Sequence, residues 1–238
     1  MSTPDSIKYS NTPTATENVW GAGLKDAKRQ SRSTAYADVA QSVTGVILGL
    51  FLFCHMAFTS SVQVSKDLFA NLINTSGGMF IAGEEMLWLH VAFVGFITLC
   101  VVIHAFCALR RFPTSYHQLR DIQAHYKMLR HEDTTLWMVQ LVTAFLLFIF
   151  VFPHLVSMLT NPHGFDVNLI GVHTYHTGML WTFIFLVITE LHGMIGLYRL
   201  CMKWCGPSNA TRSFLRKLTY VLIVGMIAMG SLDRKSVV

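Results

Sequence analysis

Four histidines lie within or at the ends of long apolar runs of this chain: His55, His104, His154 and His192. A carboxylate, Glu190, stands two residues before the last of them, in a run that is otherwise apolar. An ionisable side chain at membrane depth costs several kcal/mol unless it faces a partner, a cofactor or a water-lined path. These five residues are therefore the first candidates for chemistry.

The composition indicates an integral membrane protein. The 238 residues are 53% hydrophobic and only 13% charged, and the mean hydropathy is +0.46. A soluble domain has about 25% charged residues. The net charge of +5 does not indicate a nucleic-acid partner, because the basic residues cluster in loops beside apolar runs.

We expect an all-α fold, a bundle of five membrane-spanning helices. The predicted spans are about 36–62, 83–110, 135–159, 172–204 and 214–232. Each is close to or longer than the roughly 20 residues that cross about 30 Å of hydrocarbon. They form one domain, residues 36–238, which follows a polar arm at residues 1–35. We identify no internal repeat by inspection of the sequence.

The charges of the loops predict the orientation. The N-terminal arm and the connections at 110–134 and 199–217 are rich in Lys and Arg. The 62–83 loop has only Lys66, and the 160–171 loop has neither residue type. Basic loops stay in the cytoplasm. The N-terminus is therefore expected to be cytoplasmic.

This orientation sorts the four histidines into two pairs. His55 and His154 fall near the outer side, and His104 and His192 fall in the inner half. Two neutral imidazoles at one depth on different helices are what a six-coordinate b-type haem requires. The sequence therefore predicts two haem b groups, one above the other across the membrane.

A rival pairing would take two ligands from each of two helices. His90 and His104 are 14 residues apart, almost on one helical face, but His176 and His192 are 16 apart. That second spacing leaves them roughly 160° out of phase. We therefore favour one histidine per helix.

Four segments carry a resemblance to a known family: Gly-Leu-Phe-Leu-Phe-Cys-His-Met at 49–56, Ile-His-Ala-Phe at 103–106, Arg-His-Glu-Asp-Thr-Thr-Leu-Trp at 130–137 and Glu-Leu-His-Gly-x-x-Gly-Leu-Tyr-Arg at 190–199. Together they resemble the dihaem cytochrome b subunit of quinol:fumarate reductases and succinate:menaquinone reductases. The resemblance covers about residues 36–205. It implies the same ligand pairs, His104 with His192 for the proximal haem and His55 with His154 for the distal haem.

The resemblance also implies the setting. The chain would be the multi-pass anchor of a complex in the bacterial inner membrane. It would oxidise menaquinol near the outer side and pass electrons through both haems to a cytoplasmic iron–sulfur subunit. A flavoprotein subunit would hold FAD and the dicarboxylate site. Such heterotrimers could in turn form a dimer.

Further site residues follow from the resemblance. Gln41, Ser42, Trp137 and Lys203 match residues that bind the propionates of the proximal haem. Glu190 matches a carboxylate proposed to carry protons across the membrane with the electrons. Glu84 or Glu85 would accept the proton of the quinol, although the family places its glutamate several residues further from the histidine of the second span. His90, His173 and His176 are weaker candidates for that pocket.

Three other interpretations stay open at this point. The same subunit could work in reverse in a succinate:menaquinone reductase. The chain could be a purely structural anchor in which haem is a stabilising strut. It could also be a stand-alone transmembrane b-type cytochrome. The subunits that co-purify and a redox titration distinguish these interpretations.

Overall fold

The computed structural model describes residues 15–76, 86–129, 131–160, 178–206 and 208–237. Glu84, Glu85, His173 and His176 lie outside these residues. Within them the chain is helical apart from short connections, and no strand occurs in the described ranges. The elements are α1 (Ala15–Ser60), the 3-10 turn η1 (Ser61–Gln63), α2 (Lys66–Ser76), α4 (Leu87–Leu109), α5 (Tyr116–Leu129), α6 (Glu132–Thr160), α8 (Met179–Cys205) and α9 (Asn209–Val237).

Five helices are long and apolar enough to cross a membrane, which confirms the predicted five-helix transmembrane fold. They span Ser33–Gln63, Trp88–Leu109, Glu132–Thr160, Met179–Cys205 and Asn209–Ser231. Many of their large apolar side chains are exposed, for example Phe106, Phe152, Leu180 and Val221. In a bilayer such side chains face lipid, so their exposure is expected here.

The chain divides by its internal contacts into residues 1–39 and residues 40–238. Helix α1 runs through this division. The predicted boundary at residue 35 therefore stays a prediction, although part of the expected polar arm is helical from Ala15 onward. All packing described below lies within residues 40–238.

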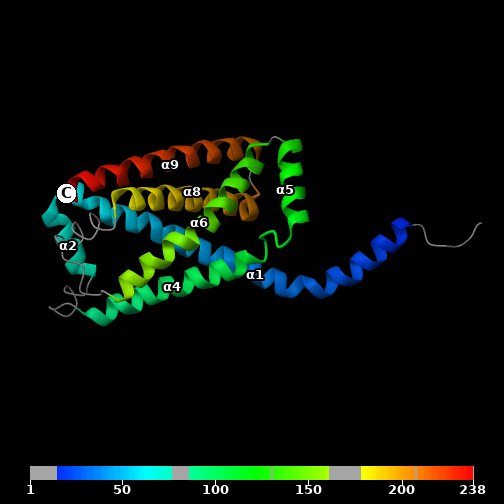
Figure 1. Cartoon of the computed structure of the whole chain (residues 1–238), viewed down its shortest axis with the longest axis horizontal. Coiled ribbons are helices and arrows are strands. Elements are labelled where there is room, and N and C mark those ends of the chain that lie inside the picture. The colour runs from blue at the N-terminus through cyan, green and yellow to red at the C-terminus, as the bar shows by residue number, and fades with distance from the viewer. Residues whose placement is uncertain (1–14, 77–85, 130, 161–177, 207, 238) are drawn as a thin grey trace, which may run out of the picture. The chain divides into compact units, whose positions relative to one another are not determined.

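Helix α8 packs against both α6 and α9, and the three helices enclose the main buried core (Figure 1). Met194, Ile195 and Tyr198 of α8 are almost fully buried, against Leu136 of α6 and Ile223 of α9. The helix ends at Cys205, and Gly206 follows with φ 51° and ψ 50°. This left-handed conformation favours glycine, so the residue type stops the helix at this point.

Glycines bring α1 close to α8. A Cβ added at Gly49 of α1 would lie 2.7 Å from Cδ2 of Leu197. A Cβ added at Gly193 of α8 would lie 2.8 Å from Cδ2 of Leu52. Small residues at such crossings let two membrane helices approach closely. This contact holds α1, which carries one candidate ligand, against α8, which carries another.

Two helices were not expected from the sequence, α2 and α5. In α2, Phe69 and Ile73 are buried against Val62 and Phe58. The neighbouring Gln63 donates from Nε2 to the carbonyl of Met229 on α9, at 2.9 Å. Both helices are short and lie in segments that hydropathy marks as loops, because an amphipathic helix needs only one apolar face.

Candidate functional site

His55 of α1 and His154 of α6 lie side by side. Their ring centres are 6.4 Å apart, and the ring planes are inclined by 71°. Two imidazole nitrogens that each lie about 2 Å from a shared metal place the ring centres roughly 6 Å apart, since each nitrogen is about 1 Å from its ring centre. The observed separation fits two axial ligands of one metal.

Aromatic side chains surround this pair. Phe51 stacks on His55 with ring centres 5.3 Å apart, and Phe185 lies 5.3 Å from His154. Phe150 continues the cluster, 4.2 Å from the ring of Trp181 and 6.0 Å from that of Phe185. Such an apolar surround excludes water and suits a flat, apolar macrocycle.

His104 and His192 form the second pair, and a neighbouring helix holds Nδ1 of each ring. Nδ1 of His192 lies 3.2 Å from the carbonyl oxygen of Gln140 and 3.4 Å from Oγ1 of Thr143, both on α6. Nδ1 of His104 lies 3.2 Å from Oγ1 of Thr44 on α1. His104 is also close enough to His192 for their charges to interact. The Nε2 atoms are thus the ones left for a ligand.

The two pairs lie at two levels of the bundle. Thr44 contacts His104, and His55 follows Thr44 by eleven residues on the same helix. Thr143 contacts His192, and His154 follows Thr143 by eleven residues on α6. Eleven helical residues rise about 16 Å. The structure therefore supports the predicted pairing, with one histidine from each of four helices.

The chemistry of these ligands fits haem. Among the described residues, no three His, Cys, Asp or Glu side chains gather into a group that could hold a metal ion. Two imidazoles fill only the two axial positions of an iron whose other four ligands come from a macrocycle. Gly45 makes room for one of them, since a Cβ there would lie 3.2 Å from Cε1 of His104.

The predicted propionate ligands lie near the His104–His192 end. Oε1 of Gln41 is buried and has no hydrogen-bond partner, and toward a carboxylate only the Nε2–H groups of this amide can donate. Trp137 lines a pocket of 580 Å³ together with Arg110 and Arg111. Lys203 lies within electrostatic range of these two arginines, with Nζ 5.0 Å from the ring centre of Trp204.

Gln41, Trp137 and Lys203 are therefore suited to meet carboxylates at this end. Ser42, on the same helix as Gln41, is half-buried.

Cations gather at this end of the bundle. Arg199 lies within electrostatic range of Arg111. Desolvation, followed by the charge of Arg111, lowers the pKa of Arg110 below the usual range of a guanidinium. Nη1 of Arg199 also donates to Oε1 of Gln140, whose carbonyl accepts from His192. Gathered cations of this kind attract an anionic group.

Glu190 is the most deeply buried polar residue of the described chain. Its exposed fraction is 0%, and neither carboxyl oxygen has a hydrogen-bond partner. A polar group buried without partners destabilises the folded state. It precedes His192 by two residues, which is about 200° around the helix, so the two side chains leave α8 in nearly opposite directions. Glu190 is thus separate from the histidine pair.

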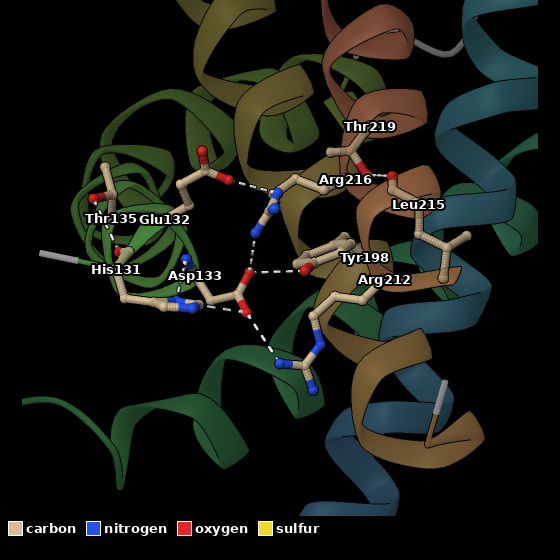
Figure 2. A network of polar contacts seen from close by, with 9 residues as sticks. All are labelled: His131, Glu132, Asp133, Thr135, Tyr198, Arg212, Leu215, Arg216 and Thr219. Carbon is tan, nitrogen blue, oxygen red and sulfur yellow. Dashed lines mark hydrogen bonds and ion pairs between the residues drawn. The ribbon is translucent and has the colours of Figure 1, made fainter. Parts of the chain in front are cut away.

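A network of charged groups ties α6, α8 and α9 together at one end (Figure 2). Tyr198 donates to Oδ1 of Asp133 at 2.7 Å. Arg216 reaches the same oxygen at 3.5 Å, and Arg212 lies 3.9 Å from Oδ2. Arg216 also pairs with Glu132 at 2.6 Å. The two carboxylates occupy the first turn of α6, where negative charge is favourable.

We expect Asp133→Asn to destabilise the assembled protein by about 1.5–3 kcal/mol, because Asp133 is the shared acceptor of Tyr198 and two arginines. The matched control is Glu132→Gln. Glu132 is 64% exposed and pairs with Arg216, so its loss should cost less than about 1 kcal/mol. Thermal unfolding of the purified protein measures both. Equal losses for the two variants would contradict the central role of Asp133.

Sequence inspection missed Thr44, Thr143 and Gln140. Each contacts a candidate ligand or its partner, yet each is a polar residue in an apolar span and looks like an ordinary helix residue. One signal was available. The pattern Gln-x-x-Thr occurs at 41–44 and again at 140–143, each time eleven residues before a histidine.

Comparison with known proteins places these residues in a family context. The sequence model described as "Succinate dehydrogenase/Fumarate reductase transmembrane subunit" matches residues 117–231. The chain is 36% identical to the fumarate reductase cytochrome b subunit of Helicobacter pylori over 214 residues, 87% of this chain and 82% of the relative. It is 31% identical to the subunit of the same name from Wolinella succinogenes over 227 residues, 90% and 88% of the two chains.

Proposed function

This chain belongs to the family of succinate dehydrogenase/fumarate reductase transmembrane subunits, and from this premise we propose that it is the membrane-anchor and electron-transfer subunit of a fumarate reductase. The observation that carries the proposal is the arrangement of four imidazoles as two pairs at two levels of one bundle. An anchor with no redox role needs no such arrangement.

Each pair would hold one haem b. His55 and His154 would hold the haem iron at one level, and His104 and His192 would hold the haem iron at the other. Gln41, Ser42, Trp137 and Lys203 would bind the propionates at the second level. When bound, the two haems supply an electron path along the bundle. The aromatic side chains around His55 and His154 keep water from that site.

Menaquinol would be oxidised near the His55–His154 level, on the outer side of the membrane. The quinol must release protons there, and Glu84 or Glu85 would accept one. His90 lies at this level too, because its ring bonds to the backbone of Met158, one turn beyond His154. It is a second candidate for contact with the quinol.

The opposite end would face the cytoplasm of a bacterium and meet the partner subunits. The cations near Arg110 and Lys203 lie at that end, with the His104–His192 level. There an iron–sulfur subunit would receive electrons and pass them to a flavoprotein that reduces fumarate. The basic loops support this orientation, with a cytoplasmic N-terminus.

A purified complex tests this proposal. An affinity-tagged chain extracted from its native membranes should bring down a flavoprotein and an iron–sulfur protein. Reduced-minus-oxidised spectra during a redox titration should resolve two b-haem components of different potential. A chain that purifies alone with haem would indicate a stand-alone cytochrome. A chain without haem would refute the electron-transfer role. Rates of fumarate reduction and succinate oxidation with the same quinone compare the two directions.

A further inference from the structure

The contacts of the two histidine pairs reveal a repeat that sequence inspection did not detect. Residues 41–55 and residues 140–154 align without a gap and are identical at seven of fifteen positions: Gln, Val, Thr, Leu, Phe, Phe and His. The second helices align as well. Residues 104–111 and 192–199 share their His, Leu and Arg, and an alanine or a glycine follows each histidine. Each repeat is thus a two-helix unit, α1 with α4 and α6 with α8.

The polar contacts to the histidine of the second helix match in the two units. In each unit the Gln-x-x-Thr segment of the first helix holds Nδ1 of the histidine on the second helix. Thr44 contacts His104 at 3.2 Å, and Thr143 contacts His192 at 3.4 Å. The backbone carbonyl of the glutamine joins each contact, Gln41 for the first ring and Gln140 for the second.

Equivalent residues of the two units also approach one another. His55 lies beside its equivalent, His154, with ring centres 6.4 Å apart. His104 and His192 interact electrostatically, and so do the arginines that end the second repeat segments, Arg111 and Arg199. One equivalent pair is therefore in contact and two more lie within electrostatic range of each other, which is the arrangement that an approximate twofold axis between the units produces.

The threonine hydroxyls and the glutamine carbonyls together decide which ring nitrogen carries the proton. A hydroxyl has a single proton to donate. Thr44 donates it to the carbonyl of Ala40 at 2.7 Å, and Thr143 donates it to the carbonyl of Val139 at 2.8 Å. Toward the imidazole each hydroxyl can then only accept, and the glutamine carbonyls can only accept as well. Nδ1 of both rings must carry the hydrogen, which leaves the lone pair on Nε2.

We propose that Thr44 and Thr143 are positioning residues that hold His104 and His192 in the tautomer that presents Nε2 to the iron, and that they lower the reduction potential of the haem at this level. The inference rests on the proposed haem pair at His104 and His192. A hydrogen bond accepted from Nδ1–H makes the imidazole a stronger donor at Nε2 and so favours the ferric state.

The test replaces each threonine by valine, which keeps the shape and removes the acceptor. We expect Thr44→Val and Thr143→Val to shift one haem component of the holo-complex to a more positive potential and to leave the other component unchanged. Loss of one hydrogen bond of about 1 kcal/mol changes the balance of the two redox states up to about fivefold. At 59 mV per factor of ten for one electron, that is about 40 mV.

The matched control is Thr219→Val on α9. Thr219 is as buried as Thr143 and also donates to a backbone carbonyl four residues earlier, that of Leu215, on a helix that carries no ligand. Thr219→Val therefore removes a hydroxyl that bonds to its own helix, as Thr143→Val does, but it affects no contact with a histidine. Thr143→Ser keeps the hydroxyl and should restore the wild-type potential.

Three results would overturn the inference: no shift in either valine variant beyond that of Thr219→Val, equal shifts of both haem components, or a serine variant as altered as the valine variant. If a valine variant does not assemble, alanine and serine at the same position carry the test, and only alanine should raise the potential. A wild-type complex with no haem b would instead refute the proposed function. If the wild-type complex shows two haem components and the threonine variants shift neither, only the role of the threonines is refuted, and the proposed function stands.

Discussion

Replacement of His192 by alanine should remove one of two b-haem components from the complex and abolish menaquinol-dependent fumarate reduction. His104→Ala should remove the same component, because the two rings occupy one level of the bundle. His55→Ala and His154→Ala should each remove the other component, since these rings lie 6.4 Å apart. In the proposed arrangement, loss of either histidine of a pair would leave the haem iron at that level without one of its two bonds to the protein.

Haem content per chain and a redox titration of each variant measure this result. His117→Ala is the control, because His117 is exposed on α5 and should keep both components. His90→Ala tests the rival pairing, in which one helix supplies two ligands. Loss of a haem in His90→Ala would contradict the assignment of one histidine per helix. So would removal of different components by His104→Ala and His192→Ala.

Glu190→Gln should leave both haems in place and reduce menaquinol-driven turnover by at least about tenfold, if the carboxyl carries a proton as the electrons cross. An electron that crosses the membrane loses or gains about 2.3 kcal/mol per 100 mV of membrane potential. A proton that crosses with it cancels that energy. The side chain is fully buried on α8 and its oxygens have no partner. A buried carboxyl that makes no hydrogen bond is better explained by a functional role than by a stabilising one.

The same burial predicts the opposite effect on stability. Glu190→Leu should raise the melting temperature of the complex, because an apolar side chain of similar length removes a buried polar group that has no partner. Thr189→Val is the matched control on the same helix, since its hydroxyl bonds only within α8, to the carbonyl of Phe185 at 2.8 Å. It should change neither turnover nor haem content.

Fumarate reduction by an artificial donor that delivers electrons directly to the flavoprotein should be unaffected in all these variants. Glu190→Gln with full menaquinol activity would contradict the proton role. A Glu190→Leu complex less stable than the wild type would show that the carboxyl has a structural partner in the assembled membrane protein.

Much of the fold follows from local chemistry. Runs of apolar residues that reach membrane length predict helices whatever their neighbours are, because an unpaired backbone in lipid costs too much. The five spans could therefore be predicted to within a few residues at each end, and with them the place of each histidine along its helix. The short helices α2 and α5 could not, because their stability comes from one apolar face, such as Phe69 and Ile73 on α2.

At the site, too, part of the arrangement follows from the local sequence and part only from the tertiary structure. By itself the sequence predicted two levels for the four imidazoles, since rise along a helix converts residue number into position along the bundle. It also indicated that burial of the Glu190 carboxyl in an apolar span costs free energy. Only the tertiary structure decided which atoms meet. Thr44 and Thr143 look like ordinary helix residues until their hydroxyls are seen to donate to their own helices and to accept from His104 and His192.

The physical reason is that hydropathy and helical rise depend on one chain segment at a time, whereas a tautomer depends on the partner of a ring nitrogen on another helix. The repeat was hidden for a related reason. Apolar side chains can replace one another in a membrane span, so eight of the fifteen aligned positions differ, and the match becomes visible only through the shared contacts of Thr44 and Thr143.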